Sequence, residues 1–377
     1  MGEITIREVK SKSDFNLFLK LPYQIFKNDK NWVPPLLFDE KCTFNKKKNP
    51  AFEFCSSRLF LAYKNGECVG RIAGILNNRA NEIWSQKRIR FGWLDFIEDI
   101  EVLRALINSV EVWAKEENLC EILGPMGFTD MDKEGMMIEG FDTLCPMACY
   151  YNPSYYPRLL EELGFEKEVD WVQYIIKANQ PIPDKISKIS QVIKEKYNLR
   201  IVTGISKKEI IKNYGHKTFR LVNESFSNLF GYVPLTEKQI DFYIKQYFTF
   251  IDPKLVCFIV DSNDDVIGFG VSMPSFSNAL KKAKGRLFPF GWYYMLRAMK
   301  NYSHIDLYLN GVHPQWQNKG IHALYFSQMN KTYIELGSMT AIANPQLETN
   351  QAALIWQKYN SELGIRRRAY IKKLNKI

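Results

Sequence analysis

The stretch Val312-His-Pro-Gln-Trp-Gln-Asn-Lys-Gly-Ile-His322 joins two segments of different periodicity. Residues 305–312 alternate as a β-strand does, whereas the residues after the stretch repeat as in an amphipathic helix. The apolar face of that helix would carry Leu324, Tyr325, Met329, Tyr333 and Leu336. The first N–H groups of a helix lack intrahelical partners and meet the positive end of its dipole, so an anion binds well there. Gly320 permits close backbone approach and Lys319 adds positive charge, although an ordinary turn has the same pattern.

The spacing Gln317-x-x-Gly320, preceded by Val312-x-Pro314, resembles the acyl-CoA loop of the GNAT N-acyltransferase superfamily. The resemblance implies that the cofactor is bound by Val312, Gln317, Asn318, Lys319, Gly320, Ile321 and His322. One position departs from the family pattern. His322 stands where a second small residue belongs, so its side chain must turn away or the loop must open slightly.

A second segment, Asn350-Gln-Ala-Ala-Leu-Ile-Trp-Gln-Lys-Tyr359, also resembles a GNAT signature. Its spacing predicts a helix, and Gly364 is expected to cap that helix in the left-handed conformation before a new strand. The resemblance implies that Tyr359 protonates or hydrogen-bonds the departing sulfur and that Asn350 binds the cofactor. The alternatives are a core aromatic residue for Tyr359 and a helix N-cap for Asn350.

The two halves of the sequence echo each other. Gly70 and Gly268 end similar strand-turn-strand patterns and lie 198 residues apart, as do Asn152 and Asn350. The prolines in the segment 177–184 between the halves are typical of a linker. We therefore predict an α/β (α+β) fold of two GNAT-like domains, each a mixed, mostly antiparallel sheet flanked by helices. The N-terminal degenerate domain would span 1–180, and the C-terminal domain with the acyl-CoA loop would span 181–377.

The first half lacks the chemistry of the C-terminal loop. Its corresponding region, 91–101, is acidic and has no glycine where the helix would begin. It would repel a pyrophosphate, so we expect one acyl-CoA per chain, with the first half closing the substrate cleft.

Acyl transfer to an amine needs a base for the amine and a proton for the leaving thiolate. Strict alternation along residues 305–312 would place Asp306, Tyr308 and Asn310 on one polar face. Asp306 is the candidate general base, directly or through water, with His304 and His313 as alternatives. By resemblance to the family, backbone N–H groups near Val312 would polarise the thioester carbonyl.

Residues 124–142 alternate glycines and acids with methionines over a length unusual for a plain connection. This pattern is typical of a functional loop or lid, whose carboxylates would attract an amine, or of a solvated surface loop. The start at Asp130 mimics a calcium loop, but Phe141 stands where a bidentate Glu is required.

The 377 residues carry 51 Lys and Arg against 41 Asp and Glu, and this charge of +10 favours anionic partners. Seven scattered cysteines with no C-x-x-C pair, and only four histidines, indicate reduced thiols and no metal site. No apolar run approaches the length of a membrane span, and the N-terminus does not read as a signal peptide. We expect a cytoplasmic protein.

Together these features predict an acyl-CoA-dependent N-acyltransferase that moves an acyl group from acetyl-CoA, or a longer acyl-CoA, to a primary amine. The acceptor would be a small molecule or a lipid amine. The aromatic runs 150–156 and 288–294 would line the core, a wide cleft or a membrane interface. If they line a cleft, the layout resembles bacterial ceramide synthases, which implies a long-chain acyl-CoA and a lipid amine. A non-catalytic acyl-CoA-binding protein and an aminoacyl-tRNA-dependent transferase are alternatives, although nucleic acid is not the expected partner. The acceptor, the acyl length and the oligomeric state stay open.

Overall fold

The computed structural model describes residues 2–248, 250–350, 353, 355–356 and 359–374. Contacts between residues divide the chain into two compact units. The first comprises Met1–Val172, Leu280–Gly291 and Ile365–Ile377, and the second comprises Gln173–Ala279 and Trp292–Gly364. Each unit takes segments from both halves of the sequence, whereas the expected domains, 1–180 and 181–377, are contiguous; that division stays a prediction. The expected α/β class, with mixed and mostly antiparallel strands flanked by helices, is confirmed.

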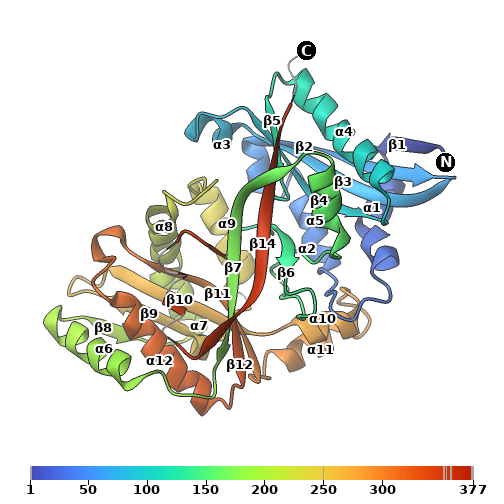
Figure 1. The fold of residues 1–377 in the computed structure, drawn as a ribbon. Coiled ribbons are helices and arrows are strands. Elements are labelled where there is room, and N and C mark those ends of the chain that lie inside the picture. The colour runs from blue at the N-terminus through green and yellow to red at the C-terminus, as the bar shows by residue number, and fades with distance from the viewer. Residues whose placement is uncertain (1, 249, 351–352, 354, 357–358, 375–377) are drawn as a thin grey trace. The chain divides into compact units, whose positions relative to one another are not determined.

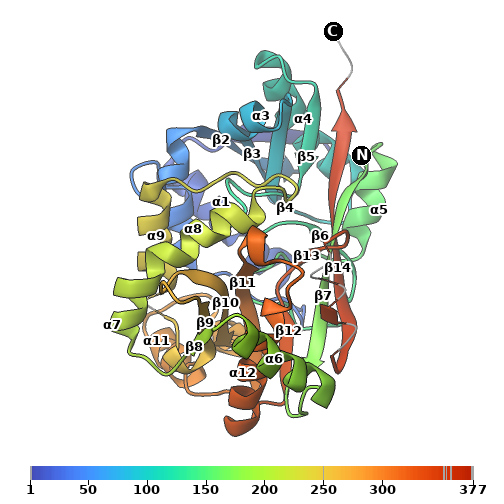
Figure 2. The ribbon, with the colours of Figure 1, turned by 90° about the vertical axis from the view of Figure 1, so that its left-hand side faces the viewer.

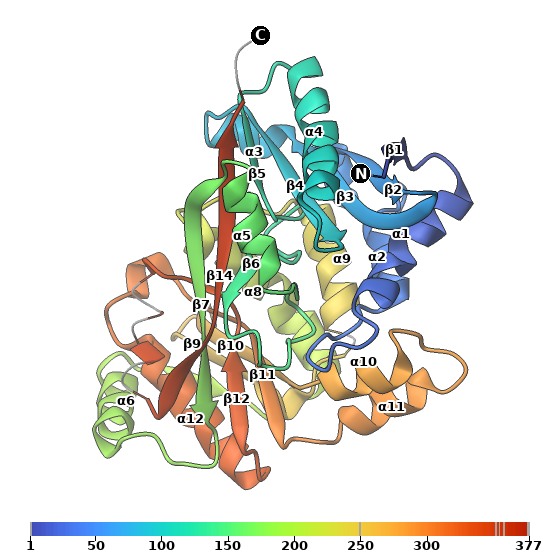
Figure 3. The ribbon, with the colours of Figure 1, turned by 45° about the vertical axis from the view of Figure 1, so that its right-hand side comes forward.

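The sheet of the first unit has the strand order β1-β2-β3-β4-β5-β14. Its strands are β1 (Ile4–Glu8), β2 (Cys55–Lys64), β3 (Glu67–Asn77), β4 (Arg88–Phe96), β5 (Glu121–Gly124) and β14 (Ser361–Lys373), and β6 (Met136–Glu139) pairs with β14. All neighbours are antiparallel except β4 and β5. The last strand comes from the far end of the chain, with Tyr370 opposite Gly124. A strand from the far end of the sequence therefore completes the edge of this sheet beside β5 (Figure 3).

Two helices cover opposite faces of these strands. The helical segments are α1 (Lys12–Ile25), α2 (Leu37–Thr43), η1 (Pro50–Glu53), α3 (Asn78–Ile83), α4 (Ile100–Glu116) and α5 (Tyr155–Glu162). The buried face of α4 packs with Ala62 and Ile72, whereas α1 packs with Leu61 and Ala73 (Figure 1). Because successive strand residues point to opposite faces, each strand contributes to two hydrophobic clusters.

The sheet of the second unit has the order β7-β12-β11-β10-β9-β8. Its strands are β7 (Glu166–Lys177), β8 (Arg200–Val202), β9 (Val256–Val260), β10 (Val266–Pro274), β11 (His304–Val312) and β12 (Thr340–Ala343), and β13 (Gln346–Leu347) pairs with β7. The one parallel pair among these neighbours in the described part of the chain is β11 with β12. Only the second part of β7 reaches this sheet, where Lys177 pairs with Thr340.

Helices cover both faces of this sheet as well (Figure 2). The helical segments are α6 (Asp184–Lys196), α7 (Lys207–Glu209), η2 (Ile210–Tyr214), α8 (Gly215–Phe226), α9 (Glu237–Tyr247), η3 (Pro253–Leu255), α10 (Ser277–Ala283), α11 (Gly291–Ala298), η4 (Pro314–Trp316) and α12 (Ile321–Glu335). A Cβ on Gly270 would lie 3.1 Å from the ring of Tyr325 in α12, and one on Gly311 would lie 3.1 Å from Ser225 Oγ in α8. These contacts place α12 on one face and α8 on the other.

Most expected elements around the junction are confirmed. The strand before it is β11, the helix after it is α12, and the predicted apolar stripe packs into one cluster with Ile305 and Leu307. The expectation for Gly364 is wrong, because this residue lies inside β14, where a Cβ would meet Ile175 at 2.7 Å. Half of the residues in the predicted helix over 350–359 lie outside the described residues, so this helix stays a prediction.

The seven cysteines form no disulfide in the described chain, and Cys145 and Cys149 are buried, as expected of reduced thiols. In the part of the chain that the structure describes, no helix combines the length and the apolar character needed to cross a membrane.

Candidate functional site

The junction between β11 and α12 is a tight turn with two left-handed residues. The 3-10 turn η4 follows β11, and Gly320 then forms the N-cap of α12 with φ 79°. Asn318 is also left-handed, with φ 61°. Left-handed residues in such turns direct successive N–H groups toward one concavity, as in anion-binding nests. A positive φ disfavours any residue with a Cβ, so the backbone conformation itself selects glycine at position 320.

Three backbone N–H groups of this turn remain available. Those of Asn318, Gly320 and Ile321 donate to no acceptor among the described residues. The neighbouring N–H of Lys319 donates to Trp316 at 3.4 Å, and that of Ala323 to the Gly320 carbonyl at 2.9 Å. Because Asn318 and Lys319 are exposed, an anion can reach these donors at the positive end of α12.

Helix α6 supports the turn from the side. A Cβ on Gly320 would lie 2.4 Å from Ile193 Cδ1, so the turn touches α6 closely. The Lys319 ammonium lies 4.8 Å from the ring centroid of Trp316 and 5.9 Å from that of Tyr197. The two rings meet edge to face at 5.4 Å. Sequence reasoning missed Ile193 and Tyr197 as neighbours of the loop, since only the α6–α12 packing brings them there.

The strands β11 and β12 separate just before this turn. Their last paired residues are Leu307 and Ala343, yet β11 continues to Val312. Asn344 closes the paired part, because its backbone N–H donates to the Leu307 carbonyl at 3.1 Å and its side-chain amide to the Tyr308 carbonyl at 2.6 Å. Beyond Leu307, the edge of β11 that faced β12 has no partner strand in the described chain, whereas its other edge stays paired with β10. Asn344 was missed from the sequence, although an asparagine directly after a strand is typical of such local bonds.

A bulge changes which side chains of β11 share a face. Val271 pairs with Leu309 but Ser272 pairs with Leu307, so Tyr308 is the extra residue. The expectation that Asn310 shares the face of Asp306 is therefore wrong. Asn310 points toward α12, where it accepts a hydrogen bond from the Tyr325 hydroxyl at 3.3 Å.

Asp306 lies on the face of β11 opposite α12. It pairs with Met273 on one side and Ile342 on the other, and it is only 6% exposed. Burial raises the pKa of its carboxyl to about 7, although a hydrogen bond from Ser275 works in the opposite direction. Its Oδ2 has no hydrogen-bond partner among the described residues. A buried carboxyl that changes its charge near neutral pH is suited to proton transfer.

The two alternative bases make other contacts. His304 Nδ1 lies 2.7 Å from the Thr340 hydroxyl, and His304 is exposed. His313 Nδ1 accepts from the Gln315 N–H at 3.2 Å, and its Nε2 lies 3.1 Å from a Glu224 oxygen. These bonds engage both rings at the ends of β11, which leaves Asp306 as the strongest candidate.

Tyr359 packs on the α12 side of the sheet. Its ring lies 5.5 Å from Phe326 and 5.9 Å from Trp356, and the residue is 8% exposed. The hydroxyl has no hydrogen-bond partner among the described residues, and burial raises its pKa. It therefore keeps its proton at neutral pH, as an acid must. Tyr359 thus packs on the face of the sheet that α12 covers, whereas Asp306 lies on the opposite face.

The Asn350 N–H donates to the Leu347 carbonyl at 2.9 Å, and the Asn350 carbonyl accepts from the Ala353 N–H at 2.8 Å. Its role in cofactor binding stays a prediction. His322, the second residue of α12, is half-buried.

The matching helix end in the first unit is already occupied. The Asp99 carboxylate caps α4 by accepting from the Glu101 N–H at 2.9 Å, and it pairs with Lys64 at 2.5 Å. This negative charge lies where a pyrophosphate would have to bind. The start of α4 is therefore unsuited to an anion, unlike the start of α12.

The stretch 124–142 is a packed loop, so the alternative of a solvated surface loop is wrong. Phe128 is fully buried, and Asp132 accepts from the Thr129 N–H at 3.1 Å. Burial raises the pKa of Asp132 to about 6. No group of three or more possible metal ligands occurs among the described residues.

Comparison with known proteins identifies the architecture. No family model matches the chain. The structure is similar to that of a tandem GNAT protein from the clavulanic acid biosynthesis pathway, with a TM-score of 0.57 and 10% sequence identity over 100% of both chains. The chain has the tandem GNAT fold. The GNAT-like fold predicted from the sequence is thus confirmed, whereas the role of the Gln317-x-x-Gly320 loop stays a prediction.

Two curated relatives match most of this chain. Protein YghO of Escherichia coli (strain K12) is 27% identical over 303 residues, which cover 78% of this chain and 74% of the relative. A bacterial ceramide synthase of Caulobacter vibrioides is 26% identical over 305 residues, which cover 79% and 77%. Both similarities span parts of each half of the sequence.

Proposed function

We propose that this protein is an acyl-CoA-dependent N-acyltransferase. The observation that carries the proposal is the set of N–H groups of Asn318, Gly320 and Ile321, which have no acceptor among the described residues at the start of α12. A diphosphate would accept from these donors, and Lys319 would add charge. The GNAT fold supports acyl-CoA as the co-substrate of this turn.

The free edge of β11 would hold the rest of the cofactor. Its residues beyond Leu307 have no partner strand on the β12 side among the described residues, so an extended chain can hydrogen-bond there as a strand would. The thioester would then lie where the strands separate, beside Tyr308, within reach of both faces of the sheet. Gln317, whose amide donates to the Val312 carbonyl at 3.3 Å, would hold the end of this edge in place.

The reaction needs two proton transfers. The amine nitrogen attacks the thioester carbonyl carbon, and Asp306 accepts the proton that the nitrogen loses. The tetrahedral intermediate then breaks its carbon–sulfur bond, and the Tyr359 hydroxyl protonates the departing thiolate. The products are an amide and free CoA. The proposed acid and base would approach the thioester carbonyl from opposite faces of the sheet. This arrangement suits a carbonyl that lies in the plane of the sheet.

A primary amine is the proposed acceptor, with acetyl-CoA as the first candidate donor. A specific observation favours a second candidate, a long-chain acyl-CoA and a lipid amine. The 26% identity with a bacterial ceramide synthase extends over 79% of the chain and supports this choice. Both candidates use the same loop and the same two proton-transfer groups, and they differ in the space needed for the acyl chain.

Thermal unfolding with acetyl-, medium- and long-chain acyl-CoA tests the donor. A ligand at a hundred times its Kd stabilises a protein by about 2.7 kcal/mol, so the preferred chain length is expected to give the largest rise in Tm. Free CoA serves as the control for binding through the nucleotide alone. If no acyl-CoA changes the Tm while RNA binds in a salt-sensitive manner, the aminoacyl-tRNA-dependent alternative replaces the proposal.

Turnover separates an enzyme from an acyl-CoA-binding protein. Release of free thiol is expected when amines are added to the protein with its preferred acyl-CoA. Binding without thiol release across a panel of small and lipid amines would contradict the catalytic proposal. It would leave a binding protein, in which His322 restricts the loop.

Replacing Tyr359 by Phe tests the proposed acid. We expect kcat to fall by about 10²-fold, with acyl-CoA affinity unchanged. Stability is not expected to fall, because the buried hydroxyl has no partner to lose among the described residues. The measurement is steady-state kinetics together with a binding titration.

Tyr333→Phe is the matched control, since Tyr333 lies in the same cluster and its hydroxyl is 2.6 Å from Ser272 Oγ. This variant is expected to lose about 1 kcal/mol of stability and to keep its turnover. Unchanged kcat in Tyr359→Phe would remove Tyr359 from the mechanism.

A further inference from the structure

One stretch of the chain combines exposed aromatic residues with unpaired positive charge. Residues 266–305 contain no aspartate or glutamate, yet they include six lysines and arginines. Helices α10 and α11 lie in this stretch, and residues 284–290 join them (Figure 3). None of these residues belongs to the proposed acyl-CoA turn.

The apolar side chains of this stretch are unusually exposed. The exposed fractions are 78% for Phe288, 68% for Phe290, 47% for Trp292, 50% for Tyr293 and 54% for Leu296. Because these residues are nearly consecutive, they lie close together, and the last three share one face of α11. Other exposed large apolar residues in the described chain lie singly or in pairs. Such a concentration of exposed apolar surface is typical of an interaction site.

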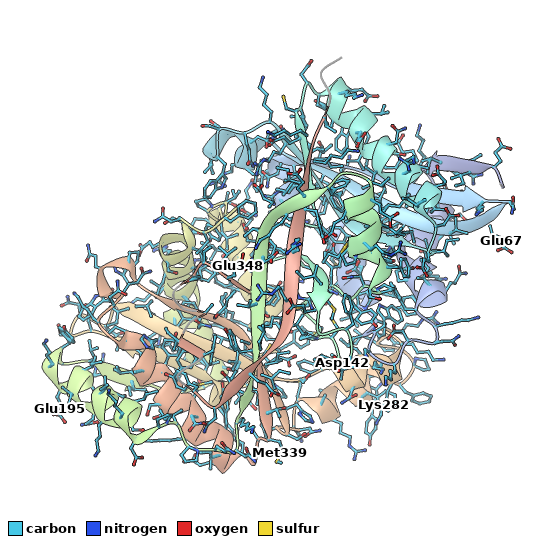
Figure 4. The ribbon with its side chains drawn as sticks, viewed as in Figure 1. Glu67, Asp142, Glu195, Lys282, Met339 and Glu348 are labelled. Atoms are coloured by element: carbon cyan, nitrogen blue, oxygen red, sulfur yellow. The ribbon has the colours of Figure 1, made fainter. Side chains whose placement is uncertain are left out.

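Basic side chains flank the apolar residues. Lys282, Lys284, Arg286, Arg297 and Lys300 are all exposed, and Lys282 is labelled in Figure 4. None of the five forms an ion pair with a carboxylate in the part of the chain that the structure describes. A sixth, Lys281, donates to the backbone carbonyl of Lys30. The partner of this surface must therefore supply the negative charge.

We infer that residues 282–300 dock the protein on a bilayer surface that carries anionic lipid head groups. Aromatic rings prefer the interface between head groups and acyl chains, and lysine and arginine are drawn to the anionic surface beside it. A second copy of this chain fits poorly, because it would bring the same uncompensated positive charge against itself. The inference concerns surface binding and does not rest on acyl transfer.

Vesicle flotation with the full-length protein, without acyl donor, tests this inference. Vesicles of phosphatidylcholine with about one third phosphatidylglycerol are expected to bind the protein, and vesicles of phosphatidylcholine alone to bind it at least about tenfold more weakly. Higher salt should release the protein from the anionic vesicles.

Two triple variants separate the contribution of the basic side chains to vesicle binding from that of the apolar side chains. The triple variant Lys282→Glu, Lys284→Glu, Arg286→Glu should reduce binding to anionic vesicles more than about tenfold, since each basic side chain near the surface strengthens binding several-fold. The triple variant Phe288→Ser, Phe290→Ser, Leu296→Ser should lose binding at all salt concentrations. Since all six side chains are exposed or at the surface, thermal unfolding should be unchanged.

Matched controls exist elsewhere on the chain. Lys185→Glu, Lys188→Glu, Lys196→Glu on α6 changes the net charge equally at three exposed lysines, and Val192→Ser on the same helix removes one exposed apolar side chain. Both should bind vesicles as the native protein does. Absence of native binding to anionic vesicles, or an equal loss in the controls, would overturn the inference. So would self-association that the Phe288 triple variant abolishes without any effect on lipid binding, because the surface would then be a contact between copies.

Discussion

Replacing Asp306 by Asn is expected to lower turnover by about 10²- to 10⁴-fold and at the same time to stabilise the protein above neutral pH. The catalytic loss follows from removing the proposed base. The gain in stability follows from burial, because the carboxyl is 6% exposed and has one oxygen without a partner among the described residues. An amide carries no charge that must be desolvated.

The sign of the pH dependence follows from the raised pKa. In the unfolded chain an aspartate titrates near about 3.9, whereas in the folded protein the pKa of Asp306 is about 7. Between these values the folded state holds a proton that the unfolded state has lost, so stability falls as pH rises from about 4 to about 7. The whole effect is at most about 4 kcal/mol. Asp306→Asn should remove this pH dependence, and the activity of the native enzyme should rise as pH rises through about 7.

Denaturant unfolding at several pH values and kinetics on the same samples provide the measurement. Asp170→Asn is the matched control, since Asp170 is also buried but accepts from Arg368 at 2.8 and 3.1 Å. Burial opposes ionisation there too, yet the bonds to Arg368 and Lys167 lower the pKa of Asp170. That variant should therefore destabilise the protein and leave turnover largely intact. Equal effects of the two variants would contradict the proposed role of Asp306.

Replacing Gly320 by Val is expected to weaken acyl-CoA binding by about 10²-fold or more, because each lost hydrogen bond to a charged phosphate costs about 1.5–3 kcal/mol. The structure adds a second reason that the sequence did not contain. A Cβ at this residue would lie 2.4 Å from Ile193 Cδ1, so the turn or α6 has to move. Isothermal titration with CoA measures the loss.

Gly337→Val is the control for backbone strain. Gly337 follows the other end of α12 and has φ 71°, and a Cβ added to it would meet no described atom within 4 Å. Gly337→Val should therefore lower the stability of the protein by the cost of a β-branched residue at positive φ, and CoA affinity should stay unchanged. The double variant Gly320→Val, Ile193→Ala relieves the clash. If this double variant binds CoA normally, contact with α6 and not the backbone donors explains the loss, and the anion-binding role of the turn is refuted.

The sequence alone was sufficient for the parts of the site that depend on neighbouring residues. Strand β11 and helix α12 follow from periodicity, and the available N–H groups between them follow from the chemistry of helix ends, which act over a few residues. The acidic cap of α4 was likewise readable, because Asp99 immediately precedes the helix that it caps. The expectation for Gly364 was wrong, because this residue lies in a strand, where contacts with a distant segment outweigh the local preference for a helix end. For the stretch 124–142, packing decided against the solvated alternative that the sequence had left open.

Only the folded chain decided which side chains meet. The bulge at Tyr308 turns Asn310 toward α12, and a bulge depends on how β11 pairs with β10, a separate segment of the sequence. The pKa of Asp306 rises because two neighbouring strands bury it, which no spacing along one strand reveals. The contact of Ile193 with Gly320 depends in the same way on helices far apart in the chain. Local sequence therefore specifies the turn between β11 and α12, whereas pairing between distant segments specifies the face, burial and protonation of the groups around it.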